Sequence, residues 1–136
     1  RNKYVYKNDK EPSFDINDPC YFGEQSKQDI MDNLTSYANM ILLSSGEAHP
    51  FVCLEGMASG LGLVLSEQST ANLDLSQSFI TVIPDDRLED TPYLKEKIEE
   101  NRKISLGMRE EIREYCRTHF DWTSVIKQYK EIIKKL

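Results

Sequence analysis

One segment organises this chain, residues 44–60, which read SSGEAHPFVCLEGMASG. The apolar run before it, Met40–Leu43, has the length of a buried strand. Pro50 suits the first position of a helix, because its fixed φ and missing N–H cost nothing there. Gly60 suits the left-handed cap after a helix. A second apolar run, Leu61–Leu65, follows at once, so the sequence predicts strand, loop, helix, tight turn and strand.

The start of the predicted helix has the properties of an anion site. The backbone N–H groups of Phe51, Val52 and Cys53 precede the first intrahelical hydrogen bonds and, with the helix dipole, favour phosphate or carboxylate. Glu47 lies in the loop before the helix, and Glu55 lies roughly 7 Å along it at ~1.5 Å per residue. Carboxylates accept hydrogen bonds from hydroxyls. These features predict a ligand with a central phosphate and hydroxyl groups at both ends, which is the shape of a nucleotide sugar.

This pattern resembles the signature of the retaining GT-B glycosyltransferases of glycosyltransferase family 4, roughly E-G-F-P-x-x-x-x-E-A-M-A-x-G-x-P-V-V. The chain keeps the Glu47-x7-Glu55 spacing and the Met57-Ala58-Ser59-Gly60 end of that signature. The resemblance extends from about Tyr21 to the C-terminus. Four positions depart from the signature, namely Ala48 for Gly, His49 for Phe, Gly56 for Ala and Gly62 for Pro.

The resemblance implies the C-terminal, donor-binding half of a GT-B enzyme. The implied fold is a Rossmann-like α/β domain, with a parallel sheet of about four strands flanked by helices and a helical C-terminal end. Residues 1–136 are expected to form one partial domain. Because the chain begins with Arg1 rather than Met, we expect a fragment or a processed piece. The resemblance implies that it lacks the N-terminal acceptor domain of the same enzyme and is inactive alone.

The implied reaction moves a hexose, with retention of configuration, from a UDP- or GDP-sugar to a glycan, lipid or other acceptor, as in polysaccharide or glycan biosynthesis. It requires no metal and no bound cofactor. The resemblance makes Glu47 the catalytic residue, which holds the donor sugar and stabilises positive charge at the anomeric carbon. Glu55 would accept hydrogen bonds from the ribose, and the diphosphate would lie near Phe51 and Val52.

The remaining donor-binding candidates belong to the same loop, and they are Ala48, His49 and Pro50. For His49, direct contact with a phosphate or hydroxyl and simple stacking or shape filling both stay open. The Arg/Lys pair that neutralises the leaving diphosphate in the family has no obvious match. Asp85-Asp86 and Glu89-Asp90 fit a solvated turn better than a metal site, since no His lies nearby.

Composition sets the broad class. The chain has 136 residues, 39% of them hydrophobic and 29% charged, which is ordinary for one globular domain. Its net charge of −6 argues against a nucleic-acid partner. Its three cysteines are Cys20, Cys53 and Cys116, without a C-x-x-C pair, which favours reduced thiols. With no apolar run of membrane-spanning length, a cytoplasmic location is expected.

Further elements follow from periodicity and turn residues. Strands are expected over Lys3–Tyr6, Pro19–Phe22 and Phe79–Ile83, and helices over Lys27–Ala38, Thr91 to about Ser105, the region of Met108–Cys116, and Thr123–Leu136. Thr91 is the expected cap of its helix. The polar loop Ser66–Asn72 is expected near Glu47, as a solvated connection or as part of the donor cleft.

The C-terminal end carries two further expectations. Phe120-Asp121-Trp122-Thr123 resembles the family's F-s-W-e turn, so Trp122 is expected to pack one end of the domain. In the last helix the apolar side chains form one stripe and the lysines face away from it. This stripe docks on protein or lies at a membrane interface, and peripheral membrane contact is therefore kept as an alternative.

Three other functional classes stay open. The first is a degenerate, non-catalytic nucleotide-sugar-binding or interaction domain, suggested by Ala48, His49 and Gly62. The second is an epimerase or phosphatase-like member of the GT-B fold, which the Glu47-x7-Glu55 spacing disfavours. The third is a generic doubly wound interaction domain in which both glutamates are solvated.

Overall fold

A computed structural model describes residues 15, 17–48 and 50–135, and its contacts divide the chain into two compact units, Arg1–Asn33 and Leu34–Leu136. α1 (Lys27–Leu34) lies almost wholly in the first unit and ends before the predicted Ala38. Ser26 caps its start, because the Asp29 N–H donates to Ser26 Oγ at 3.1 Å and Ser26 Oγ donates to Asp29 Oδ2 at 2.6 Å.

The strand predicted over Pro19–Phe22 is wrong, because Asp18 turns the chain there. Its carboxylate accepts from the Cys20 N–H at 2.7 Å, and its carbonyl accepts from the Tyr21 N–H at 2.9 Å. A side chain that satisfies nearby backbone donors in this way competes with strand pairing. The strand predicted over Lys3–Tyr6 lies outside the described residues.

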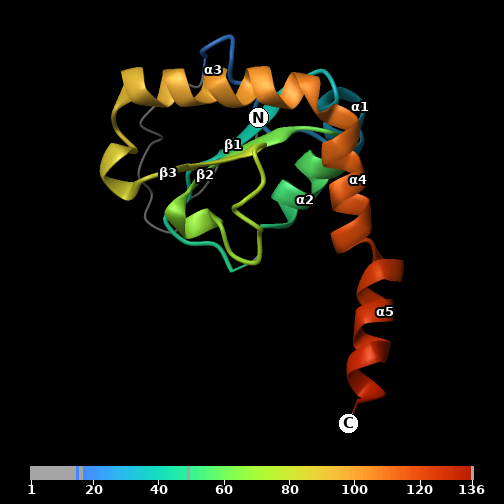
Figure 1. The fold of residues 1–136 in the computed structure, drawn as a ribbon. Coiled ribbons are helices and arrows are strands. Elements are labelled where there is room, and N and C mark those ends of the chain that lie inside the picture. The colour runs from blue at the N-terminus through green and yellow to red at the C-terminus, as the bar shows by residue number, and fades with distance from the viewer. Residues whose placement is uncertain (1–14, 16, 49, 136) are drawn as a thin grey trace, which may run out of the picture. The chain divides into compact units, whose positions relative to one another are not determined.

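The second unit is built on a parallel sheet of three strands, β1 (Asn39–Leu42), β2 (Gly62–Ser66) and β3 (Ile80–Ile83), in that spatial order (Figure 1). All five residues of β2 are buried, as expected of the central strand of a parallel sheet. The described residues thus confirm the three strands predicted from apolar runs at these positions. About four were expected for the whole chain.

Helices cover both faces of this sheet, so the unit is a three-layered α/β structure (Figure 1). On one face Leu63 and Leu65 of β2 join the main apolar core with α2 (Phe51–Ala58) and α4 (Arg109–Phe120). α3 (Thr91–Gly107) lies against the other face. This agrees with the predicted α/β class of helices flanking a parallel sheet.

On the other face, polar contacts hold α3 closely against the sheet. Asn101 is fully buried, and its Nδ2 donates at 3.0 Å to each of the Leu63 carbonyl, the Phe79 carbonyl and Thr81 Oγ1. Ser105 Oγ donates to the Asn101 carbonyl at 2.7 Å. A Cβ on Gly62 would stand 1.8 Å from that same Ser105 Oγ. The glycine at this position is therefore required by the close approach of α3.

The predicted turn between α2 and β2 is confirmed at Gly60, whose φ is +80°. Its N–H donates to the Met57 carbonyl at 2.9 Å, and the Leu61 N–H donates to the Gly56 carbonyl at 3.0 Å. These bonds close the end of the helix in the way that a left-handed glycine allows. A Cβ here would also stand 3.0 Å from the Arg109 carbonyl, so α4 packs directly against the turn.

The C-terminal helices correct two predictions. α3 is capped by Asp90 rather than Thr91, because the Asp90 carboxylate accepts from the Tyr93 N–H at 3.0 Å. Asp121 likewise caps α5 (Trp122–Ile133), accepting from the Thr123 N–H at 2.9 Å. Trp122 is 79% exposed rather than packed on the domain end. Trp122 is the first residue of α5, and the main contact of α5 is with α4.

Candidate functional site

The loops at the carboxyl end of the sheet form one connected rim. Ser66, the last residue of β2, donates from Oγ to the Ser44 carbonyl after β1 at 2.6 Å. The Glu47 N–H donates to the carbonyl of Gln68, which lies in the 3₁₀ turn Glu67–Ser69, at 3.2 Å. Gln68 Nε2 in turn donates to Asp85 Oδ2, after β3, at 3.1 Å. The predicted proximity of the Ser66 loop to the Glu47 loop is confirmed.

Glu47 lies on the exposed side of this rim, ahead of α2. Its carboxylate accepts from Ser44 Oγ at 3.0 Å, which orients the side chain within its own loop. Burial, and after it the negative charge of Glu47, raises the pKa of the Cys53 thiol to about 11. The charge of Glu47 is thus felt in the first turn of α2, as expected for a carboxylate in front of that helix.

The helix start differs in detail from the prediction. α2 begins at Phe51, and Pro50 precedes it as an extended N-cap residue with φ −74° and ψ 94°. The carbonyl of Pro50 accepts from the Cys53 N–H at 2.9 Å, so one of the three predicted donors is used within the first turn. Proline offers no side-chain cap, and the side chains of Phe51 and Val52 are 72% and 40% exposed. The first two residues of α2 are therefore exposed at the rim, whereas Pro50 before them is buried.

Glu55 lies on the exposed side of α2, the same side as Val52. The opposite side of the helix, formed by Cys53, Gly56 and Met57, is buried in the core. Gly56 is accommodated there because Met40 fills its space, with Cε 3.2 Å from the position of an added Cβ. The fold thus presents both predicted carboxylates to solvent. Ala48 is exposed beside Glu47, whereas His49 lies outside the described residues.

The rim is acidic. Four carboxylates on its described loops are exposed, Glu47, Glu67, Asp85 and Asp86. Arg87, in the 3₁₀ turn Asp85–Arg87, pairs with Asp90 at 3.1 Å and lies over the Tyr93 ring. In the described part of the chain, no group of three or more His, Cys, Asp or Glu side chains is placed to hold a metal ion.

Sequence reasoning missed the two buried serines that hold the rim together. Ser66 and Ser69 are fully buried, and their hydroxyl oxygens lie 3.0 Å apart. The sequence predicts a solvated connection or a cleft lining for residues 66–72, and these two serines are buried and have neither role. The available signal was the Ser-x-x-Ser spacing directly after a fully apolar strand, which suits a hydroxyl bridge in a tight turn.

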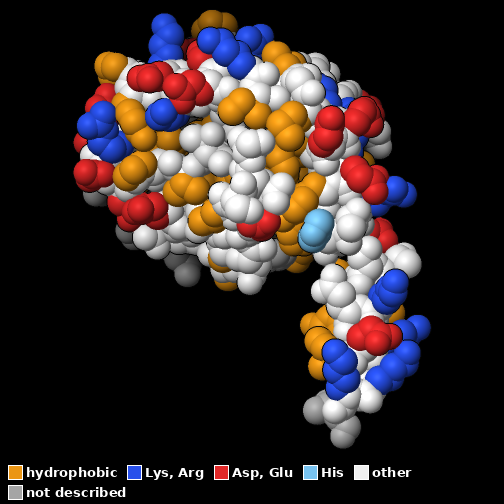
Figure 2. Space-filling view, viewed as in Figure 1, with side chains coloured by type: hydrophobic (Ala, Val, Ile, Leu, Met, Phe, Trp, Pro, Cys, Tyr) orange, Lys and Arg blue, Asp and Glu red, His pale blue; other side chains and the backbone are white. Residues whose placement is uncertain are grey.

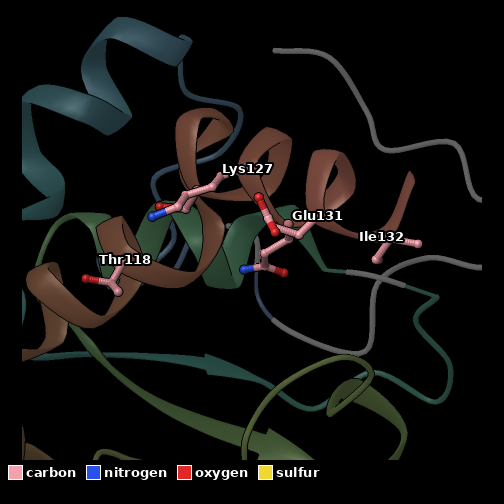
Figure 3. Close-up of a pocket in the computed structure, with 6 residues that line it drawn as sticks. Thr118, Lys127, Glu131 and Ile132 are labelled. Carbon is pink, nitrogen blue, oxygen red and sulfur yellow. The ribbon is translucent and has the colours of Figure 1, made fainter. Parts of the chain in front are cut away.

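A separate groove lies between α4 and α5. It has a volume of about 510 Å³, and Figure 3 shows Thr118 of α4 with Lys127, Glu131 and Ile132 of α5 along it. Ser124 and Gln128 complete the lining. None of the residues that line it belongs to the rim, so the groove is not part of the predicted donor site.

Comparison with known proteins adds no assignment. No family model, curated protein or solved structure matches this chain. Within the described residues, none of the helices combines the length and apolar character needed to cross a bilayer. The functional assignment therefore depends on the geometry of the rim and α2.

Proposed function

We propose that the second unit is the donor-binding part of a retaining, Rossmann-like GT-B glycosyltransferase, which moves a hexose from a nucleoside diphosphate sugar to a glycan, lipid or other acceptor. One observation carries this proposal. The first residues of α2, Phe51 and Val52, are exposed at the carboxyl end of a parallel sheet, between two exposed carboxylates, Glu47 before the helix and Glu55 along it. Ligands of open α/β sheets bind at this end.

In the proposed complex the donor diphosphate lies at the start of α2, near the backbone of Val52, where the helix dipole favours negative charge. Glu55 accepts hydrogen bonds from the ribose hydroxyls. Glu47, held by Ser44, accepts from the sugar hydroxyls and stabilises positive charge that develops at the anomeric carbon. The main contribution to catalysis is electrostatic stabilisation of the departing diphosphate. The bound nucleotide is UDP or GDP, and no step uses a metal.

The acidic rim means that a bound diphosphate needs positive charge from elsewhere. Glu47, Glu67 and Asp85 are exposed on the loops around the start of α2 and oppose the approach of a diphosphate. We propose that basic side chains from the acceptor domain, or from chain outside the described residues, neutralise the diphosphate when the enzyme is complete. The second unit alone should then bind the nucleotide weakly.

One alternative is favoured by the same acidity: a degenerate, non-catalytic nucleotide-sugar-binding or interaction domain. Not every position that differs from the family signature supports this alternative. Gly62 differs from the family pattern, but a side chain there would strike Ser105 of α3, so this glycine reflects packing rather than loss of a ligand. Ala48 and His49 are the departures that remain in favour of the alternative.

Calorimetric titration with UDP, GDP and ADP tests the proposal. We expect one nucleotide to bind, and Glu55→Gln to weaken it roughly tenfold or more through the loss of charge-assisted hydrogen bonds. Glu111→Gln is the matched control, because Glu111 is an exposed glutamate of α4, and it should bind as the parent does. Equal binding by both variants would contradict the assignment of Glu55. No binding, even with an added acceptor domain, would favour the degenerate alternative.

A further inference from the structure

α5 carries an apolar stripe that lies open to solvent. Its most exposed members are Trp122 at 79%, Ile133 at 65% and Tyr129 at 64%. These residues and Ile126 recur at spacings of three and four, which places them on one side of the helix. Figure 1 shows α5 continuing beyond α4, away from the sheet. The main contact of α5 is with α4, so the core of the second unit does not use this stripe.

The polar side of α5 is basic in a chain whose net charge is −6. The helix and the residues directly after it hold a single acidic side chain, Glu131, beside lysines at 127, 130, 134 and 135. Figure 2 shows Lys side chains next to the hydrophobic ones on this helix. On α4, by contrast, Arg113 and Arg117 each pair with a glutamate of their own helix. Among the described residues, Lys134, directly after α5, forms an ion pair with Glu131 at 3.1 Å.

The apolar stripe and the lysines beside it together indicate what kind of surface α5 binds. A short helix with aromatic and aliphatic residues on one side and lysines on the other suits the interface of an anionic bilayer, where aromatic rings sit at headgroup level and lysines meet lipid phosphates. Two aromatic rings, at the start and near the middle of the stripe, with lysines beside it, match the headgroup layer of an anionic bilayer, and we take that surface as the occupant. The length of α5, about 18 Å at ~1.5 Å per residue, suits a helix lying flat.

We propose that α5 is an interfacial anchor that inserts its apolar stripe into a bilayer containing anionic lipids. Trp122, Ile126, Tyr129 and Ile133 enter the headgroup region, and Lys127, Lys130 and Lys134 bind the negatively charged surface. This membrane contact is independent of the proposed donor site, because the residues of α5 and those of the rim do not overlap.

Trp122 supplies a direct probe, since it is the only tryptophan of the chain. We expect its fluorescence to shift to shorter wavelength when vesicles of phosphatidylcholine mixed with phosphatidylglycerol are added, and to be quenched by brominated acyl chains. Vesicles of phosphatidylcholine alone should give a much smaller shift. Added salt should weaken the response to anionic vesicles, because it screens the lysines.

Two variants test the contributions of the apolar stripe and of the lysines separately. Ile133→Asp and the double variant Lys127→Glu/Lys130→Glu should each weaken binding to anionic vesicles roughly tenfold or more. The control is Lys95→Glu/Lys103→Glu, which makes the same change in net charge at exposed positions of α3 and should leave binding near that of the parent. Circular dichroism checks that all variants are folded.

Several results would overturn the proposal. They are the absence of a Trp122 shift with anionic vesicles, equal weakening by the α5 and α3 double variants, and binding that Ile133→Asp leaves unchanged. Concentration-dependent self-association that Ile133→Asp abolishes, without vesicle binding, would assign the stripe to a second copy instead. The vesicle and nucleotide assays read different sites, so failure of one leaves the other to be judged by itself.

Discussion

The α3 face and the carboxyl end of the same sheet use polar side chains in different ways. On the α3 face Asn101 and Ser105 are fully buried and direct their hydrogen bonds to the sheet and to each other. At the carboxyl end the buried serines tie loops together, while Glu47 and Asp85 remain exposed. The first arrangement fixes the packing of a helix, and the second holds an open rim in place.

The largest loss of stability is expected at Gly62, where α3 packs directly against the sheet. Gly62→Ala would place a Cβ 1.8 Å from Ser105 Oγ and 2.6 Å from Asn101 Oδ1. Because both neighbours are fixed by hydrogen bonds, we expect a loss of about 3 kcal/mol in the free energy of unfolding, measured by urea denaturation. Gly107→Ala is the control, since no atom lies within 4 Å of its added Cβ. Equal losses in both variants would contradict a special role for Gly62.

A smaller loss is expected at Asn101 itself. Asn101→Ala leaves a cavity and removes the donor shared by the Leu63 and Phe79 carbonyls. We expect the free energy of unfolding to fall by about 2 kcal/mol. Arg102→Ala, at the adjacent exposed position, should change it by less than about 0.5 kcal/mol. If the two variants proved equally stable, Asn101 would not hold α3 to the sheet.

At the rim, the buried hydroxyl of Ser66 should matter less than Asn101. Ser66→Ala removes the bonds to the Ser44 carbonyl and to Ser69 Oγ, and we expect a loss of about 1 kcal/mol. The Glu47 loop should also exchange its amide hydrogens faster, because Ser44 anchors that loop. Ser76→Ala, an exposed serine outside the rim, serves as the control. Unchanged exchange near Glu47 would show that the loops are not coupled through Ser66.

The smallest expected effect is on the pH dependence of stability, through the buried Cys53 and the exposed Glu47. The pKa of Cys53 is raised from 9.0 to about 11, so the folded state keeps the thiol protonated where the unfolded state has begun to lose its proton. The stability from this group is full below pH 9 and is lost as the pH rises towards 11. Cys53→Ala should flatten that decline. Glu47→Gln should lower the pKa of Cys53, read from the pH dependence of its alkylation; an unchanged profile would contradict the placement of Glu47.

Sequence reasoning succeeded where local signals agree and failed where distant contacts decide. β1, β2 and β3 were predictable because each is an apolar run bounded by turn residues, and the left-handed turn at Gly60 followed from its place after the helix. Asn101 gave no signal, since an asparagine in a charged helix segment is normally solvated. The partners of Glu47 could not be read either, because Gln68 reaches it only once the sheet has formed.

Two local failures have different causes. The apolar character of Pro19–Phe22 suggested a strand, but the Asp18 side chain satisfies the backbone there first. Trp122 was expected to pack because of a turn motif, and the motif says nothing of which side of α5 meets α4. Its exposure of 79% made the stripe of α5 recognisable as an uncovered surface.

Amide NMR of the second unit during titration with UDP and GDP compares the rim and the α3 face most directly. A donor site at the start of α2 predicts that shifts concentrate at Val52, Glu55 and Gln68, while Asn101 and Ser105 stay unmoved. Glu47→Gln should reduce the shift at Val52. Shifts confined to the groove between α4 and α5, or spread evenly over the unit, would contradict the assignment of the rim as the nucleotide-sugar site.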